Sequence, residues 1–195
     1  MAGSPAIVRL GIESLDQVLK PIGFKRRKQL WNRRVVPFVD TVDIQVSKFR
    51  DAFTINVGVM DPDVHRILWG SDRGEFVDEP SCTVRTRIGG LIDRRDKWWK
   101  IEDAHAASEA SSDVANYVVP FLSRMHSREA MRQWLVDAEV HKKRYPPDII
   151  YLAILEGFLG NSAQSCALLA VLRDKATSEP WRVRIDDVMK QLRCR

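Results

Sequence analysis

Two arginines stand two positions apart in the segment "CTVRTRI", residues 82–88. Apolar and polar residues alternate there, which is typical of a β-strand, and residues two apart on a strand project from the same face. Arg85 and Arg87 would therefore stand about 7 Å apart along the strand, a spacing suited to a phosphate or carboxylate group. The same side chains could instead lie on an ordinary solvated face and pair with acids such as Asp43.

Further polar residues are expected on the same face of the sheet. The segments 40–49 and 53–60, "DTVDIQVSKF" and "FTINVGVM", alternate in the same way. If helices cover only one face, the other face carries the polar positions of all three segments. Two neighbouring tryptophans follow, and either could stack on a base, a sugar or a proline, although packing in a core or interface is the commoner role. The candidate ligand-binding residues are therefore Arg85, Arg87, Gln45, Asn56, Trp98 and Trp99.

A basic segment precedes these strands. No acidic residue occurs between Gln17 and Val39, and Trp31 is embedded among the cations. Basic residues mixed with an aromatic one are typical of single-strand nucleic-acid binders. A lysine- and arginine-rich edge strand also prevents edge-to-edge aggregation, so the pattern has a purely structural reading. The candidate nucleic-acid-binding residues are Lys25, Arg26, Arg27, Lys28, Arg33 and Arg34.

Composition indicates a globular protein. The chain has 195 residues, 45% hydrophobic and 29% charged, with a net charge of +5. Its three cysteines lie far apart and are odd in number, which predicts a reducing compartment and no disulfide framework. The N-terminus lacks the pattern of a secretory signal, and the longest apolar stretch is too short to cross a bilayer. We expect a cytoplasmic protein with no membrane partner.

Signals for catalysis or metal binding are weak. No serine lies in a Gly-x-Ser-x-Gly motif and no cysteine lies in a thiol-enzyme motif. The segment "DIQVSK" superficially resembles a nuclease strand, but alternation sends Gln45 and Lys48 to opposite faces. We predict no catalytic residue, metal site or cofactor. The histidines without ligand spacing are His65, His105, His126 and His141.

The order of patterns predicts an α+β fold, with a mostly antiparallel sheet of about four strands, an N-terminal helix on one face and a C-terminal helical portion. The helix is expected at 6–20, the first strand at 28–36, a long loop at 61–81, and a turn at Gly89-Gly90. Pro120 should kink or interrupt the first C-terminal helix. Further helices are expected at 128–143, capped by Ser127, and at 146–160, 163–176 and 185–192. The helices at 146–160 and 163–176 should pack as an antiparallel hairpin. Residues 1–103 should form the helix and sheet, and 104–195 the C-terminal helices, packed on it as one continuous domain.

Five segments in order carry a family resemblance: "GFKRRKQLWNR", "VDIQVSK", "FTINVGV", "CTVRTRIGGL" followed by "WWKI", and "VVPFLSRMHSREAM". With them the chain, from residue 10 to about 135, resembles the bacterial family catalogued as domain of unknown function 4304. The resemblance implies an α+β domain without an assigned activity, and it supplies no catalytic residues. It nominates the residues at recurrent positions without giving them a role, namely Arg85, Arg87, Trp98, Trp99, Gln45 and Asn56.

Two functions follow as expectations. The first is a non-enzymatic binding module that recognises a protein partner, of an immunity or accessory type. The alternative is a binder of an anionic ligand or nucleic acid, through Arg85, Arg87 and the basic segment 20–34. A hydrolase would need acids close to the two arginines, and the sequence does not show whether any converge there.

Overall fold

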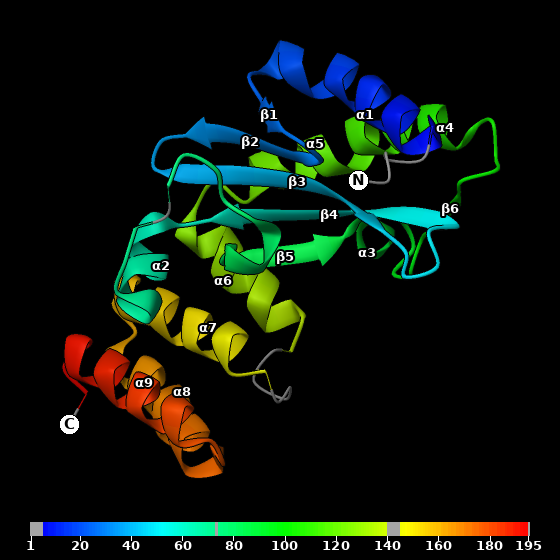
Figure 1. Ribbon diagram of the computed structural model, residues 1–195. Coiled ribbons are helices and arrows are strands. Elements are labelled where there is room, and N and C mark those ends of the chain that lie inside the picture. The colour runs from blue at the N-terminus through cyan, green and yellow to red at the C-terminus, as the bar shows by residue number, and fades with distance from the viewer. Residues whose placement is uncertain (1–5, 73, 140–144, 195) are drawn as a thin grey trace.

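The structure, a computed structural model, describes residues 6–72, 74–139 and 145–194. An antiparallel sheet lies against helices on one side, and the last three helices lie beyond one of its edges (Figure 1). The N-terminal helix α1 spans Ala6–Leu19, as predicted. Helices combined with an antiparallel sheet make this the predicted α+β fold.

Within the described residues, the sheet has six strands rather than about four. They are β1 (Lys25–Arg27), β2 (Leu30–Val35), β3 (Phe38–Val46), β4 (Ala52–Met60), β5 (Val84–Arg87) and β6 (Trp99–Lys100). Their order is β1-β2-β3-β4-β5, and β6 also pairs with β4, beside β5. The two strands that were not predicted, β1 and β6, have three and two residues. Such short strands cannot show a period-two pattern.

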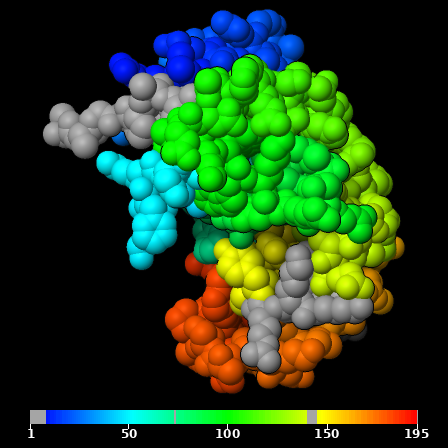
Figure 2. Space-filling view, turned by 90° about the vertical axis from the view of Figure 1, so that its right-hand side faces the viewer, coloured from blue at the N-terminus to red at the C-terminus, as the bar shows by residue number. Residues whose placement is uncertain are grey.

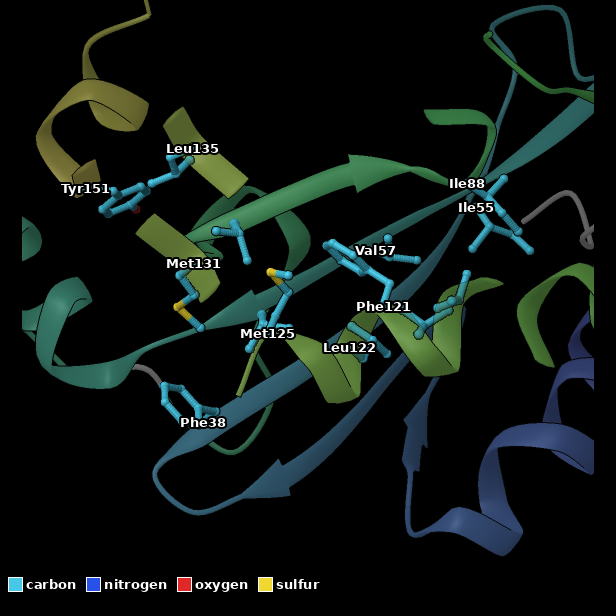
Figure 3. Packing of buried hydrophobic residues seen from close by; sticks show 14 of the residues in the cluster. Phe38, Ile55, Val57, Ile88, Phe121, Leu122, Met125, Met131, Leu135 and Tyr151 are labelled. Atoms are coloured by element: carbon cyan, nitrogen blue, oxygen red, sulfur yellow. The ribbon is translucent and has the colours of Figure 1, made fainter. Parts of the chain in front are cut away.

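One face of this sheet forms the main core. Val42 and Ile44 of β3 and Ile55 and Val57 of β4 are buried there, as their alternation predicted. The covering helices are α1, α4 (Ala106–Asp113) and α5 (Val119–Arg124) (Figure 1). Figure 3 shows side chains of the α5 region pointing toward Val57.

Pro120 does not break the first C-terminal helix. A π-helical turn, Val114–Val118, joins α4 to α5, so the chain is helical from 106 to 124. Pro120 lies in the first turn of α5. A π turn changes the hydrogen-bonding pattern locally, and this is where the chain accommodates a residue without an N–H.

The prediction of a long loop at 61–81 was wrong in its first part, because α2 spans Pro62–Trp69. The Asp61 side chain caps this helix by accepting hydrogen bonds from the backbone N–H groups of Asp63 and Val64. Gly70 ends it in a left-handed conformation. An Asp-Pro start and a glycine stop are ordinary helix signals, and scattered acids obscured them. The short helix η2 (Glu79–Ser81) ends the connection to β5.

In the described part of the chain after Ser127, four helices follow. Helix α6 (Arg128–Asp137) starts at its predicted cap Ser127, and its last predicted residues, 140–143, lie outside the described residues. Helices α7 (Pro146–Phe158) and α8 (Ser162–Lys175) pack against each other as predicted. Helix α9 (Glu179–Gln191) begins earlier than predicted.

The expectation of no disulfide was wrong, because Cys166 and Cys194 are bonded. They are 28 positions apart in the sequence, yet their Cα atoms lie 5.4 Å apart. Helix α9 runs back along α8, so the end of α9 lies beside the start of α8. The sequence separation of the two cysteines does not reveal this. Cys82 is a buried free thiol.

Gly89 and Gly90 lie in the short helix α3 (Ile88–Ile92) and not in a simple turn. A Cβ atom on Gly89 would lie 2.0 Å from the carbonyl oxygen of Arg95 and 2.7 Å from the backbone nitrogen of Lys97. These are backbone atoms, so they cannot rotate away. Only glycine allows residues 95–97 to pass this closely.

We therefore expect Gly89→Ala to destabilise the protein by about 2–3 kcal/mol, as overpacking of a tight contact does. Gly74→Ala is the matched control, because nothing lies within 4 Å of a Cβ atom there. Its effect should stay within about 0.5 kcal/mol. Urea unfolding measures both, and equal midpoints for the two variants would contradict this account of Gly89.

Candidate functional site

The polar face of the sheet is divided into a covered half and an open half. The segment that follows α2 crosses the first half, where Val77 and Cys82 pack on Val39 and Met60. Asn32 holds this segment, because its side chain donates to the Val77 carbonyl at 3.0 Å and accepts from the Val77 N–H at 2.7 Å. The other half of the face remains open to a ligand.

The open half forms a hollow of about 450 Å³, called here the sheet hollow. Figure 2 shows the surface receding between the green part of the chain and the yellow start of α7. All four polar residues predicted on the three strands contribute to it. The lining residues are Gln45, Asn56, Glu79, Arg85, Thr86, Arg87 and Asp148.

Arg85 lies between an acid and an aromatic ring. Its guanidinium is 3.5 Å from the Glu79 carboxylate and 5.3 Å from the centre of the Tyr145 ring. Tyr145 is 46% exposed, so this ring presents a free surface beside the hollow. The contacts orient Arg85 without burying it.

Arg87 has a similar environment. Its Nη1 donates to both oxygens of Asp96, at 2.9 and 3.1 Å, and its guanidinium lies 5.3 Å from the Trp98 ring. Trp98 Nε1 donates to the same Asp96 carboxylate at 2.9 Å. The hydrogen bond from Trp98, helped by Arg87, lowers the pKa of Asp96. Asp96 therefore stays ionised and holds the arginine and the tryptophan together.

The amides form the floor of the hollow. Asn56 is paired across the strands with Arg87, and its Nδ2 donates to Gln45 Oε1 at 3.0 Å. Arg87 Nη2 approaches the same oxygen at 3.4 Å. Gln45, Asn56 and Arg87 are therefore one hydrogen-bonded group, as their shared face predicted.

Trp98 and Trp99 have different surroundings. Trp98 is half-buried at the rim, over Arg87. Trp99 is 3% exposed, is stacked on Phe53, and donates from Nε1 to Glu109 at 2.8 Å. Strand alternation sends adjacent residues in opposite directions, so Trp99 packs in the core and does not reach the sheet hollow.

Most cations of the basic segment interact within the chain. Arg26 contacts Asp16 at 3.0 Å and Arg33 contacts the buried Asp40 at 2.8 Å. Trp31, embedded among them, is fully buried. The remaining contacts are Lys25 with Glu75 at 3.9 Å, Arg34 with the Gly74 carbonyl at 2.9 Å, and Arg27 over the Phe76 ring at 5.0 Å. These pairs reduce the positive potential that the sequence predicted.

A second hollow of about 540 Å³ lies beside this segment, lined by Arg27, Lys28, Gln29, Leu30 and Asp43. Burial raises the pKa of Asp43, a hydrogen bond from Asn56 acts against this, and the charge of Asp78 adds to it. Burial likewise raises the pKa of Glu79, against the charge of Arg85. The ionised carboxylates of Asp43 and Glu79 therefore destabilise the folded state.

Sequence reasoning missed the residues that complete the site from outside the strands. Glu79 comes from η2, Asp96 from the loop after α3, and Tyr145 and Asp148 from the start of α7. No motif connects them with β5, since they meet only through the tertiary fold. Within the described part of the chain, no group of three or more His, Cys, Asp or Glu could hold a metal ion. Nor do those residues include a helix long and apolar enough to cross a membrane.

These features define an α+β protein whose open sheet face carries a polar hollow with oriented arginines. The chain matches the family described as domain of unknown function (DUF4304) over residues 15–124, and it belongs to that family. No curated protein and no solved structure matches it. The matched residues end before α6, so Tyr145 and Asp148 lie outside them.

The raised pKa of Asp43 leads to a prediction about stability and pH. The folded state binds the Asp43 proton more tightly than the unfolded state, so stability falls as pH rises from 3.8 through the folded pKa. Asp43→Asn removes this cost. We expect its melting temperature to exceed that of the wild type by about 1–2 °C at neutral pH. The gain should vanish below about pH 3, where the unfolded carboxyl is protonated as well.

Asp51→Asn is the matched control with the opposite sign. A hydrogen bond with Ser47 lowers the pKa of Asp51, so this carboxylate stabilises the fold above pH 3.8 and loses that effect as pH falls. Its replacement should lower the melting temperature at neutral pH. Melting curves between pH 2.5 and 7 for the three proteins measure both effects, and a destabilised Asp43→Asn at neutral pH would refute the first.

Proposed function

We propose that this protein is a non-enzymatic binding protein that recognises a protein partner through the sheet hollow, in an immunity or accessory role. The proposal rests above all on the two arginine–aromatic pairs at the hollow, Arg85 with Tyr145 and Arg87 with Trp98. Tyrosine, tryptophan and arginine are the residue types most enriched among the hot spots of protein interfaces.

The pairs are also preorganised. Glu79 and Asp96 hold the arginines in place, so less side-chain freedom is lost when a partner binds. The lining combines cations, anions and amides, and so offers charges of both signs together with hydrogen-bond donors and acceptors. Such a mixed surface suits a folded protein better than a uniformly negative polymer.

The test is a comparison of captured proteins. Wild type and the double variant Arg87→Ala/Trp98→Ala are used as baits in nuclease-treated lysate of the producing organism, and the captured proteins are quantified by mass spectrometry. We expect one or a few proteins on the wild type, lost from the double variant. With the purified partner, calorimetry should then show a loss of affinity of at least about tenfold, as removal of a hot spot causes.

Arg124→Ala is the matched control, because the Arg124 guanidinium also lies near an aromatic ring, 6.0 Å from the centre of Phe121. Arg124 is not among the residues that line the sheet hollow. This variant should retain the partner. The melting temperatures of all baits are compared, so that unfolding is not mistaken for lost binding. Partners that bind the double variant as well as the wild type would refute the use of the sheet hollow.

The alternative is the binding of an anionic ligand or nucleic acid through Arg85, Arg87 and the segment 20–34. The second hollow supports it, since Arg27 and Lys28 line it and neither forms an ion pair with another described residue. It predicts a raised ratio of absorbance at 260 to 280 nm in the purified protein and an oligonucleotide affinity that falls as salt rises. A bacterial, cytoplasmic setting belongs to the proposal in either form.

A further inference from the structure

The Cys166–Cys194 disulfide joins the second turn of α8 to the chain just after α9. Both cysteines are half-buried, and Cys194 packs against the core without being enclosed in it. Thiol–disulfide exchange needs access of a thiolate to one sulfur along the S–S axis. Neither cysteine is closed off from solvent, as a pair enclosed in the core would be.

A helix-ending turn brings Cys194 to its partner. Arg193 adopts a left-handed conformation, with φ of 56°, and its N–H donates to the Lys190 carbonyl at 3.1 Å. The N–H of Cys194 then donates to the Met189 carbonyl at 2.9 Å. This pair of hydrogen bonds is a Schellman motif, which turns the chain back over the helix. The turn directs Cys194 toward α8, where it also packs against the main core.

Helix α9 is held on the protein by contacts that do not involve the disulfide. Arg184 Nη1 donates to the Leu68 carbonyl at 3.1 Å, and Gln191 Nε2 donates to the Ile67 carbonyl at 3.1 Å. Trp181 packs edge-on against Trp69, with ring centres 6.1 Å apart. Since these contacts remain when the sulfurs separate, opening the disulfide would free only the turn after Gln191, residues 192–194, and leave the fold intact.

The third cysteine behaves differently. Cys82 is 1% exposed, between the segment that covers the sheet, to which it belongs, and the sheet itself, and burial raises the pKa of its thiol to about 12. A thiol that is buried and protonated neither attacks nor is attacked. Cys82 therefore serves as an internal reference for the reactivity of the other two.

We propose that Cys166 and Cys194 form a redox-reactive site, at which the disulfide opens and closes on the folded protein by exchange with a dithiol reductant. One thiolate of the dithiol attacks a sulfur of the pair, which forms a mixed disulfide and expels the other cysteine as a thiolate. The second thiol of the reductant then displaces the first cysteine. The protein gains two electrons and two protons, and the dithiol becomes a disulfide.

The test uses the full chain purified without reductant. Maleimide labelling in denaturant should find one thiol, Cys82, and three thiols after dithiothreitol has acted on the native protein. Hydrogen exchange read by mass spectrometry should then accelerate by about tenfold or more at the end of α9 and stay unchanged in β4. Oxidised glutathione should restore the slow exchange. The melting temperature should fall by roughly 5–10 °C on reduction.

Cys194→Ser should reproduce the reduced state in hydrogen exchange and in melting temperature. Cys82→Ser should keep the slow exchange at α9. Three outcomes overturn the proposal. The disulfide could resist dithiothreitol until denaturant is added, which makes it a permanent structural bond. Reduction could leave exchange at α9 unchanged, or it could accelerate exchange in β4 as well, which makes the disulfide a requirement of the whole fold.

Discussion

The structure depends on strand β4, which is buried on both faces along almost its entire length. It pairs with β3 on one side and with β5 and β6 on the other. The segment after α2 covers part of its polar side, where Cys82 packs on Met60. Close packing there requires Gly58, because a Cβ atom at that position would lie 2.6 Å from Cβ of Cys82. Further along, Asn56 keeps its hydrogen bond to Gln45, and the face opens into the sheet hollow.

Helix α2 connects strand β4 with the C-terminal helices. Asp61, directly after β4, accepts from Arg128 of α6 at 2.7 Å, and Arg128 also contacts Asp63 at 2.7 Å. At the other end of α2, Arg184 of α9 donates to the carbonyl of Leu68. Arginines from two different helices thus hold both ends of α2. The start of α7 forms one wall of the sheet hollow.

The hollow therefore combines two parts of the chain. Its floor comes from strands within the residues that match the family, whereas Tyr145 and Asp148 come from beyond them. The family portion supplies the arginines, and the C-terminal helices supply the surface opposite to them. A partner that fills the hollow would contact both, so its specificity would depend on residues outside the family match.

Local patterns predicted the parts of the site that local geometry controls. Alternation placed Gln45, Asn56, Arg85 and Arg87 on one face, and the structure brings all four into one hollow. The predicted helix over residues 6–20 and the cap at Ser127 are also local features. The short strands β1 and β6 were missed, because their pairing comes from neighbours and not from their own sequence. Helix α2 was missed although its capping residues were visible.

Residue order was enough to predict which side chains share a face, because the direction of a side chain on a strand repeats every two residues. The residues that those side chains contact depend on the fold of the whole chain. Glu79 and Asp96 reach the two arginines from separate loops, and Cys194 reaches Cys166 across 28 positions. Such pairs follow from how elements pack over long distances along the chain, for which a single sequence carries no periodic signal.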